Sequence, residues 1–201
     1  ALLAAVLAAM LVVGSALVAE PAGAVQPNGH DGRLVSGTSP VPWTPNVQDG
    51  YVSAFAEMGD TIIVGGNFTG VRAPGSSTTI SRRHLFAFQR STGAISSVFV
   101  PTVNSEVTAI EPTGDGRTVW IAGGFTTLNG QSTSRLAKVD VTTGQKVTSF
   151  APPSFNGRVH DIQLRGGRLF VEGRFTTVGG QPHTLVAAVD PTTGVLDPAV
   201  K

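Results

Sequence analysis

The chain has 201 residues, a net charge of +1 and 13% charged residues, which is about half the ~25% usual for soluble domains. Because it has no run of basic residues, we expect no nucleic-acid partner. Hydrophobic residues make up 41% of the chain, which is enough for a core, and the absence of cysteine excludes disulfides.

The N-terminal residues predict export. Residues 1–19 are apolar and uncharged, and small residues follow that end in Ala-Gly-Ala at positions 22–24. This arrangement is typical of a signal peptide, so we predict one over residues 1–24 and a secreted or cell-surface protein with no membrane contact after cleavage. An uncleaved membrane anchor is the alternative, since about 18 apolar residues can span a bilayer. Residues 25–42 are rich in Gly, Pro, Ser and Asn, which predicts a flexible leader.

From residue 43 onward the sequence repeats itself three times. The clearest landmark is a glycine two positions before a phenylalanine, and the three pairs are Gly66 and Phe68, Gly123 and Phe125, and Gly173 and Phe175. Other landmarks keep the same order in every unit: an opening valine (Val52, Val107, Val159), a turn that ends in glycine (Gly93, Gly144, Gly194), and an aromatic residue two positions before a proline (Trp43, Phe99, Phe150). Such self-similarity is the signature of a repeat architecture.

Each unit is expected to contain four short strands. Their sequences are rich in Val, Ile and Phe and are bounded by Gly, Asp and Thr turns, which are strand signals. Four antiparallel strands in a repeat of about 50 residues form the blade of a β-propeller. We therefore predict an all-β, incomplete β-propeller over residues 43–201, with about three four-stranded antiparallel blades near 52–100, 107–151 and 159–201.

Two kinds of glycine have predicted structural roles. Gly66, Gly123 and Gly173 interrupt strands, so we expect close backbone approach or a bend there, with Phe68, Phe125 and Phe175 filling the gaps between adjacent sheets. In the D-x-T-T-G turns, Asp140 and Asp190 are expected to accept a backbone N–H two residues on, while Gly144 and Gly194 adopt positive φ. The first unit has Gln89 in place of the aspartate, which predicts a less firmly capped turn.

Three repeats are too few to close a propeller, which generally needs ~4–8 blades. The third unit stops within its expected last strand, and Trp43 and Pro45 match the end of a fourth strand whose first three are missing. We therefore expect the remaining propeller blades downstream of residue 201. A three-sheet arc closed by a partner chain is the alternative.

The phrase G-G-x-F-T-T-x-x-G-Q followed by R-L-A-x-V-D-x-x-T-G resembles the delta-sixty repeat, a β-propeller repeat common in secreted bacterial proteins. The resemblance covers roughly residues 43–201 and is strongest at 123–144 and 173–194. The first unit departs from the pattern by six extra residues within 72–84. The resemblance implies a propeller and an exported protein, and it carries over no catalytic residue.

No catalytic, metal or cofactor motif is found. The four histidines do not have metal-ligand spacing, and Asp115 in the sequence GDGR is interpreted as part of a hairpin turn rather than of a calcium loop. We expect ligand contacts in the loops at one face of the propeller, and the candidate residues are Arg72, Arg82, Arg83, His84, Asp49, Glu106 and Arg158. The first four lie in the insertion, which is either a solvated mobile loop or a basic contact for an acidic glycan or a partner protein.

These observations favour a secreted, non-catalytic propeller scaffold for binding or adhesion to an extracellular glycan or protein. The alternative is a secreted propeller hydrolase or lyase acting on polysaccharide. That alternative requires a carboxylate pair, such as Glu106 with Asp49 or Asp161. The fold hosts both classes of protein, so the choice depends on the site.

Overall fold

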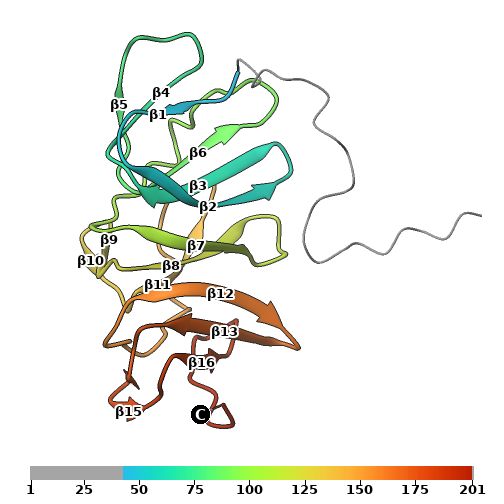
Figure 1. Ribbon diagram of the computed structural model, residues 1–201. Helices are drawn as coiled ribbons and strands as arrows, with labels where there is room; N and C mark the ends of the chain where they lie inside the picture. The colour runs from blue at the N-terminus through green and yellow to red at the C-terminus, as the bar shows by residue number, and fades with distance from the viewer. Residues whose placement is uncertain (1–42, 201) are drawn as a thin grey trace, which may run out of the picture. The chain divides into compact units, whose positions relative to one another are not determined.

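The computed structural model describes residues 43–200, which form short antiparallel strands (Figure 1). The predicted signal peptide and flexible leader, residues 1–24 and 25–42, lie outside the described residues. Between residues 43 and 200 the chain forms no helix, and hence none long and apolar enough to cross a membrane.

Each repeat builds one three-stranded antiparallel sheet, whose middle strand pairs with both neighbours. The first sheet contains β2 (Tyr51–Met58), β3 (Thr61–Asn67) and β6 (Leu85–Gln89). The second contains β7 (Val107–Pro112), β8 (Thr118–Gly123) and β11 (Leu136–Asp140), and the third contains β12 (Val159–Arg165), β13 (Arg168–Gly173) and β16 (Val186–Val189). The first three strands predicted for each unit are therefore confirmed.

The sheets have three strands rather than the four predicted. Each expected fourth strand contributes a single isolated bridge, and these bridges are Phe88 to Ile95, Val139 to Lys146 and Val189 to Leu196. After the bridge in the first two units the chain leaves the sheet and buries the aromatic landmark, Phe99 or Phe150, in the apolar core. The segment therefore buries its aromatic ring in the core and does not continue to pair with the third strand of the sheet.

A short hairpin that the sequence did not predict lies between the second and third strands of each sheet. The three hairpins are β4 (Gly70–Arg72) with β5 (Ile80–Ser81), β9 (Thr127–Leu128) with β10 (Gln131–Ser132), and β14 (Thr177–Val178) with β15 (Gln181–Pro182). The segment before each sheet pairs with this hairpin, through β1 (Asn46–Val47) in the first unit and through the bridges of Val103 and Phe155 in the others. The insertion of the first unit forms the long loop between β4 and β5 at the top of Figure 1.

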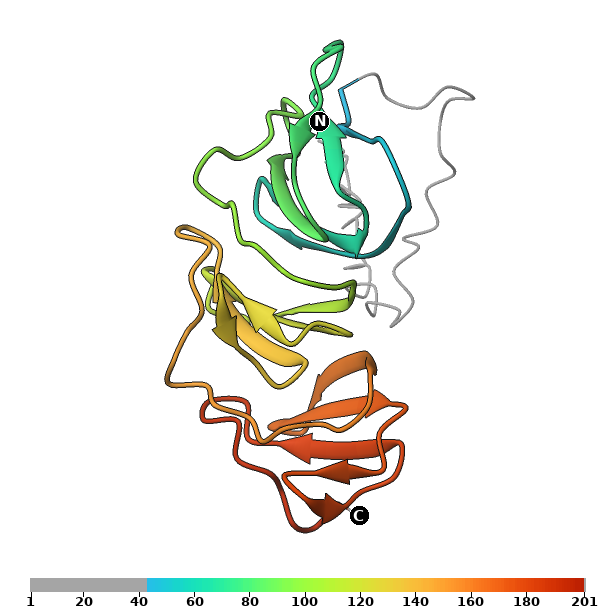
Figure 2. The same ribbon diagram turned by 90° about the vertical axis from the view of Figure 1, so that its left-hand side faces the viewer.

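Apolar side chains fill the spaces between neighbouring sheets, which lie one above the next in Figure 2. Between the first and second sheets, Ile63 and Ile121 are buried in one cluster with Phe125. Between the second and third, Trp120 and Phe175 share another cluster. The prediction that these phenylalanines pack between adjacent sheets is therefore confirmed for Phe125 and Phe175.

Phe68 has a different environment from its two equivalents. It is buried in a cluster of the first unit alone, where its ring meets Phe86 edge-on at 5.5 Å between centroids and lies near Val71. Phe68 therefore packs within its own unit, between the β2-β3-β6 sheet and the small β1-β4-β5 sheet, and not between the sheets of neighbouring units. That part of the prediction is corrected, although the side chain remains buried.

The turns after the third strands follow the predicted chemistry. Thr142 N donates to Asp140 Oδ1 at 2.8 Å, and Thr192 N donates to Asp190 Oδ1 at 3.0 Å. Gly144 and Gly194 have φ of 70° and 82°. These hydrogen bonds lower the pKa of the exposed Asp190, chiefly through Thr193.

In the first unit a different carboxylate caps the turn. Asp60, from the loop between β2 and β3, accepts hydrogen bonds from Ser91 N at 2.9 Å and from Ser91 Oγ at 2.6 Å. The Gln89 side chain accepts from the Thr92 hydroxyl at 2.9 Å, and no backbone N–H of the turn donates to it. The aspartate missing at position 89 is thus offset by one that is distant in sequence.

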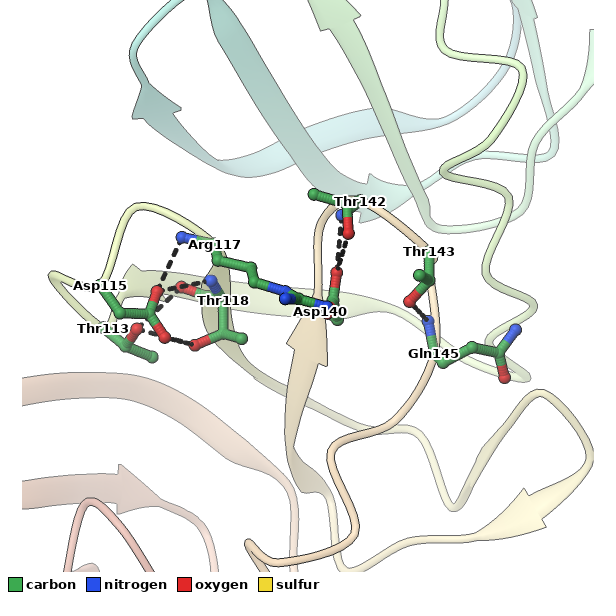
Figure 3. Close-up of polar contacts among 8 residues, drawn as sticks. All are labelled: Thr113, Asp115, Arg117, Thr118, Asp140, Thr142, Thr143 and Gln145. Atoms are coloured by element: carbon green, nitrogen blue, oxygen red, sulfur yellow. Dashed lines mark hydrogen bonds and ion pairs between the residues drawn. The ribbon is translucent and has the colours of Figure 1, made fainter.

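Asp115 organises the hairpin between β7 and β8 (Figure 3). Its carboxylate accepts hydrogen bonds from Arg117 N and Thr118 N, both at 2.7 Å, and Arg117 Nε in turn donates to Asp140 Oδ2 at 2.7 Å. Burial acts to raise the pKa of Asp115, but the hydrogen bonds from Thr118 and Arg117 outweigh it and hold this pKa well below its ordinary value. The interpretation of GDGR as a hairpin turn is confirmed.

We predict that Phe125→Ala lowers the free energy of unfolding by about 3–5 kcal/mol, because it leaves a cavity between two sheets. Phe55→Ala is the matched control, since Phe55 is 72% exposed, and it should change stability by less than about 0.5 kcal/mol. Urea unfolding followed by the fluorescence of the buried Trp120 measures both variants. If both variants lost the same free energy of unfolding, the assignment of Phe125 to a core between sheets would be contradicted.

We also predict acid destabilisation through Asp115. A carboxyl whose pKa is lower in the folded than in the unfolded chain stabilises the fold above its unfolded pKa of about 3.9, and this contribution falls as the pH drops towards the folded value. Asp115→Asn should therefore cost about 1 kcal/mol at pH 7, and the difference from the parent should narrow as the pH falls from 4 to 2. Urea unfolding between pH 4 and pH 2 tests this prediction, and Glu172→Gln, at an exposed position, is the control. If the difference in unfolding free energy between Asp115→Asn and the parent did not change with pH, the prediction would be contradicted.

Candidate functional site

Each sheet has a β-bulge near the start of its first strand. The register shifts between Val52 and Ala54, between Val107 and Ala109, and between Val159 and Asp161. One residue in each strand is consequently left out of the pairing, and these three residues, which we call the bulge row, are Ser53, Thr108 and His160. Bulges re-aim side chains and are frequent next to active sites, so the bulge row marks a candidate site.

The repeat glycines produce these bulges. A Cβ on Gly66 would lie 2.2 Å from Tyr51 O, and one on Gly173 would lie 2.2 Å from Arg158 O, so only glycine fits. The N–H of each glycine donates to the carbonyl of a residue with positive φ before the third strand, and these residues are His84, Arg135 and Leu185. Non-glycine residues rarely adopt positive φ, and its recurrence in all three units indicates a shared backbone requirement. The predicted close approach at the repeat glycines is confirmed.

Side chains at one repeat position converge on Glu106. Tyr51, Glu106 and Arg158 each precede the opening valine of their unit. Tyr51 Oη donates to Glu106 Oε2 at 3.2 Å, and the Arg158 guanidinium donates to the same oxygen in an ion pair. Ser53 Oγ donates to Glu106 Oε1 at 2.7 Å. One carboxylate thus links the first strands of all three sheets.

The environment of Glu106 keeps its carboxyl ionised. The residue is 7% exposed. Burial on its own acts to raise the pKa of Glu106, but hydrogen bonds from Ser53 and Arg158, together with the charge of Arg158, bring it below its ordinary value. Both carboxylate oxygens are engaged, so Glu106 is suited to hold Arg158 in place and poorly suited to donate a proton.

A cleft of about 430 Å³ opens beside this cluster, and we call it the arginine cleft. It is lined by Ser53, Thr108, Arg158, His160 and Arg174. Thr108 Oγ1 donates to Val159 O at 2.8 Å, which ties the second sheet to the third beside the cleft. The lining therefore combines two guanidinium groups and an imidazole with two hydroxyl groups, and includes no carboxylate.

Sequence reasoning missed Arg174 and the bulge row as site residues. Arg174 stands between Gly173 and Phe175, where the other units have Asn67 and Gly124. A cationic residue at an otherwise uncharged repeat position was the available signal. The bulge row offered no comparable signal in the sequence, because a serine, a threonine and a histidine share no obvious pattern.

The structure places the seven predicted candidates in different environments. Glu106 and Arg158 are in contact, as described above. The residues of the insertion contact their own hairpin and its neighbours: Arg72 Nε donates to Thr79 Oγ1 at 3.0 Å, and Arg82 donates to Ser81 O at 2.9 Å and Ser96 O at 3.0 Å. Arg83 is exposed.

His84 is held by its backbone and is half-buried. Its φ is 64°, and its N–H donates to Phe68 O at 3.0 Å. Burial lowers the pKa of His84, although the charges of Glu106 and Asp49 act in the opposite direction. The imidazole is therefore neutral near pH 7 and adds no positive charge to the insertion.

Asp49 is engaged in a contact that recurs in every unit. Its carboxylate accepts hydrogen bonds from the Thr69 hydroxyl, from Thr69 N at 2.8 Å and from Gly70 N at 3.1 Å. These bonds, the hydroxyl first, lower the pKa of Asp49. Asn104 and Asn156 make the equivalent contacts through Oδ1, with Thr126 N and Thr176 N, both at 2.9 Å. This Asp/Asn position, three residues before the opening valine, is a repeat landmark that sequence reasoning missed.

A larger cavity lies away from these residues. It has a volume of about 550 Å³ and is lined by apolar and uncharged polar residues of the first two units, among them Met58, Phe88, Val98 and Val141. Because it offers no charged group, it is a weaker candidate than the arginine cleft despite its size. Among residues 43–200, no group of three or more His, Cys, Asp or Glu side chains is placed to hold a metal ion.

Comparison with known proteins gives structural similarity without a sequence match. No family model and no curated protein sequence matches it. Among solved structures, the computationally designed Ika4 protein is similar, with a TM-score of 0.48 and 13% identity over 76% of this chain and 74% of that one. The computationally designed Ika8 protein has a TM-score of 0.36 and 13% identity over 72% of this chain and 60% of that one. Residues 43–200 themselves form small antiparallel sheets without a helix, and they are structurally similar to these two designed proteins.

Proposed function

We propose that the chain is part of a secreted, non-catalytic β-propeller of the delta-sixty repeat type that serves as a scaffold for binding or adhesion outside the cell. The observation that carries this proposal is the convergence of equivalent side chains from three sheets on Glu106, with the arginine cleft open beside it. A site assembled from several repeats, with its polar groups held in place by one another, is suited to recognising an extracellular glycan or protein.

The uncovered face of the first sheet supports a propeller with further blades. Phe55 is 72% exposed, whereas its equivalents Ile110 and Ile162, which face the preceding sheet, are 9% and 5% exposed. Val52 on the same strand is also exposed. Large exposed apolar patches usually mark an interface. Blades downstream of residue 201 would cover this face in a closed ring, and a partner chain would do so in the alternative of a three-sheet arc.

The state of Glu106 favours binding over catalysis. A general acid needs a raised pKa, whereas the pKa of Glu106 is lowered and both of its oxygens already accept hydrogen bonds. Asp49, one of its two expected partners in a catalytic pair, is occupied by Thr69 and Gly70. The Glu106 carboxylate therefore holds neighbouring side chains in place and is poorly suited to take part in the reaction of a bound ligand.

A secreted propeller hydrolase or lyase acting on polysaccharide is the second candidate, and Glu111 on β7 is the observation that favours it. Burial raises the pKa of Glu111, a hydrogen bond from Leu164 N opposes this, and the charge of Asp161 raises it further. A carboxyl with a raised pKa near a second carboxyl is the arrangement that glycoside-cleaving enzymes use. For this second candidate, Glu111 and Asp161 are the carboxyl pair to test.

The binding proposal predicts retention on immobilised glycans without turnover. We expect the chain to bind members of a glycan array and to release no chromophore from a panel of chromogenic glycosides. Glu106→Gln should weaken glycan binding at least several-fold, because a neutral amide no longer fixes Arg158. Glu57→Gln, at the far end of β2, is the control that should bind like the parent. Turnover that disappears in Glu111→Gln or Glu106→Gln would overturn the non-catalytic assignment.

A further inference from the structure

The arginine cleft has the charge and the donors of an anion-binding site. Arg158 directly precedes β12 and Arg174 directly follows β13, the strand paired with it, and Arg174 N donates to Arg158 O at 2.8 Å. Both side chains therefore start from the same end of the third sheet. Both line the cleft together with His160 and two hydroxyl residues. No carboxylate is among the lining residues, and the one carboxylate that pairs with a lining arginine is Glu106, which holds Arg158.

The two arginines have unequal roles in this charge balance. Glu106 neutralises Arg158 and holds it through one nitrogen, but a guanidinium has five N–H donors, so others remain for a ligand. The Arg174 side chain is exposed and forms no hydrogen bond or ion pair with the rest of residues 43–200. The cleft therefore contains one guanidinium that is held in place and another that is uncompensated. Such a pair recognises carboxylates through paired N–H donors.

Tyr51 adds an apolar surface beside these donors. It is 54% exposed, and its hydroxyl is fixed by Glu106, so the ring is held in place while it remains open to solvent. Ser53, which lines the cleft, lies on the same strand two residues further on. A fixed aromatic ring next to guanidinium and hydroxyl groups suits a ligand with an apolar ring face, several hydroxyls and a negative charge.

We propose that the arginine cleft binds the carboxylate of an acidic saccharide, such as a uronic acid residue within an extracellular polysaccharide. Arg174 and Arg158 hold the carboxylate, Ser53, Thr108 and His160 contact the neighbouring hydroxyls, and the sugar ring packs towards Tyr51. This inference rests on the proposed binding function and names the ligand class for that function.

Isothermal titration of the 201-residue chain with a uronic acid tetrasaccharide tests the inference, with a neutral tetrasaccharide and a sulfated one as comparisons. We expect the uronate to bind, the neutral sugar to bind at least tenfold more weakly, and the affinity for the uronate to fall with added salt. Arg174→Ala should weaken uronate binding about tenfold, and Arg174→Lys should weaken it less. Arg165→Ala, at the other end of β12, is the matched control and should bind like the parent.

The outcomes separate this inference from the function on which it rests. Unchanged uronate binding by Arg174→Ala, with its thermal melting temperature also unchanged, would overturn the arginine cleft as the site. Equal binding of the neutral sugar would overturn the anionic ligand class while leaving a glycan-binding scaffold intact. Tighter binding of the sulfated sugar would overturn the carboxylate in favour of a sulfate. Hydrolysis of any of the three would overturn the proposed function itself.

Discussion

One close backbone contact in every repeat underlies both the sheets and the candidate site. At Gly66, Gly123 and Gly173 the first strand of the sheet passes so near that a Cβ would lie within 2.2 Å of a carbonyl oxygen. This contact places the bulge at the same point in each unit and lets the first strand bend without losing its partner. Because the three bulges coincide along the stack, the three side chains of the bulge row are presented at one end of the sheets.

The polar cluster around Glu106 complements the apolar packing between the sheets. Apolar contacts are non-directional and favour any arrangement that removes surface from water. The hydrogen bonds from Tyr51 and Ser53 and the ion pair with Arg158 connect side chains from all three sheets, so they are formed together only in one arrangement. An ion pair to a buried carboxylate adds little net stability, but it strongly disfavours arrangements that leave Glu106 unpaired. The same contacts that specify the stacking also fix Arg158 at the edge of the cleft.

Much of the fold was predictable because its signals are local and repeated three times. The first three strands of each unit, the strand glycines and the D-x-T-T-G turns each depend on residues close together in sequence. The fourth strand was predicted wrongly, because its apolar residues serve the core between sheets rather than the sheet edge. The capping of the first turn by Asp60 could not be read from the turn itself, since the aspartate lies about 30 residues away. In the candidate site, Glu106 and Arg158 were predicted from the sequence as separate loop residues. Their ion pair was not predicted.

The sequence by itself determined an all-β repeat chain, its three units and the positions at which only glycine fits, because strand patterning and backbone conformation are decided by neighbouring residues. Only the tertiary structure decided which side chains form the site. Asp49 and Glu106 are both acidic residues just before a first strand, yet one caps its own unit while the other joins three sheets. The difference arises because contacts between sheets depend on how the repeats stack, and stacking brings together residues that are about 50 positions apart.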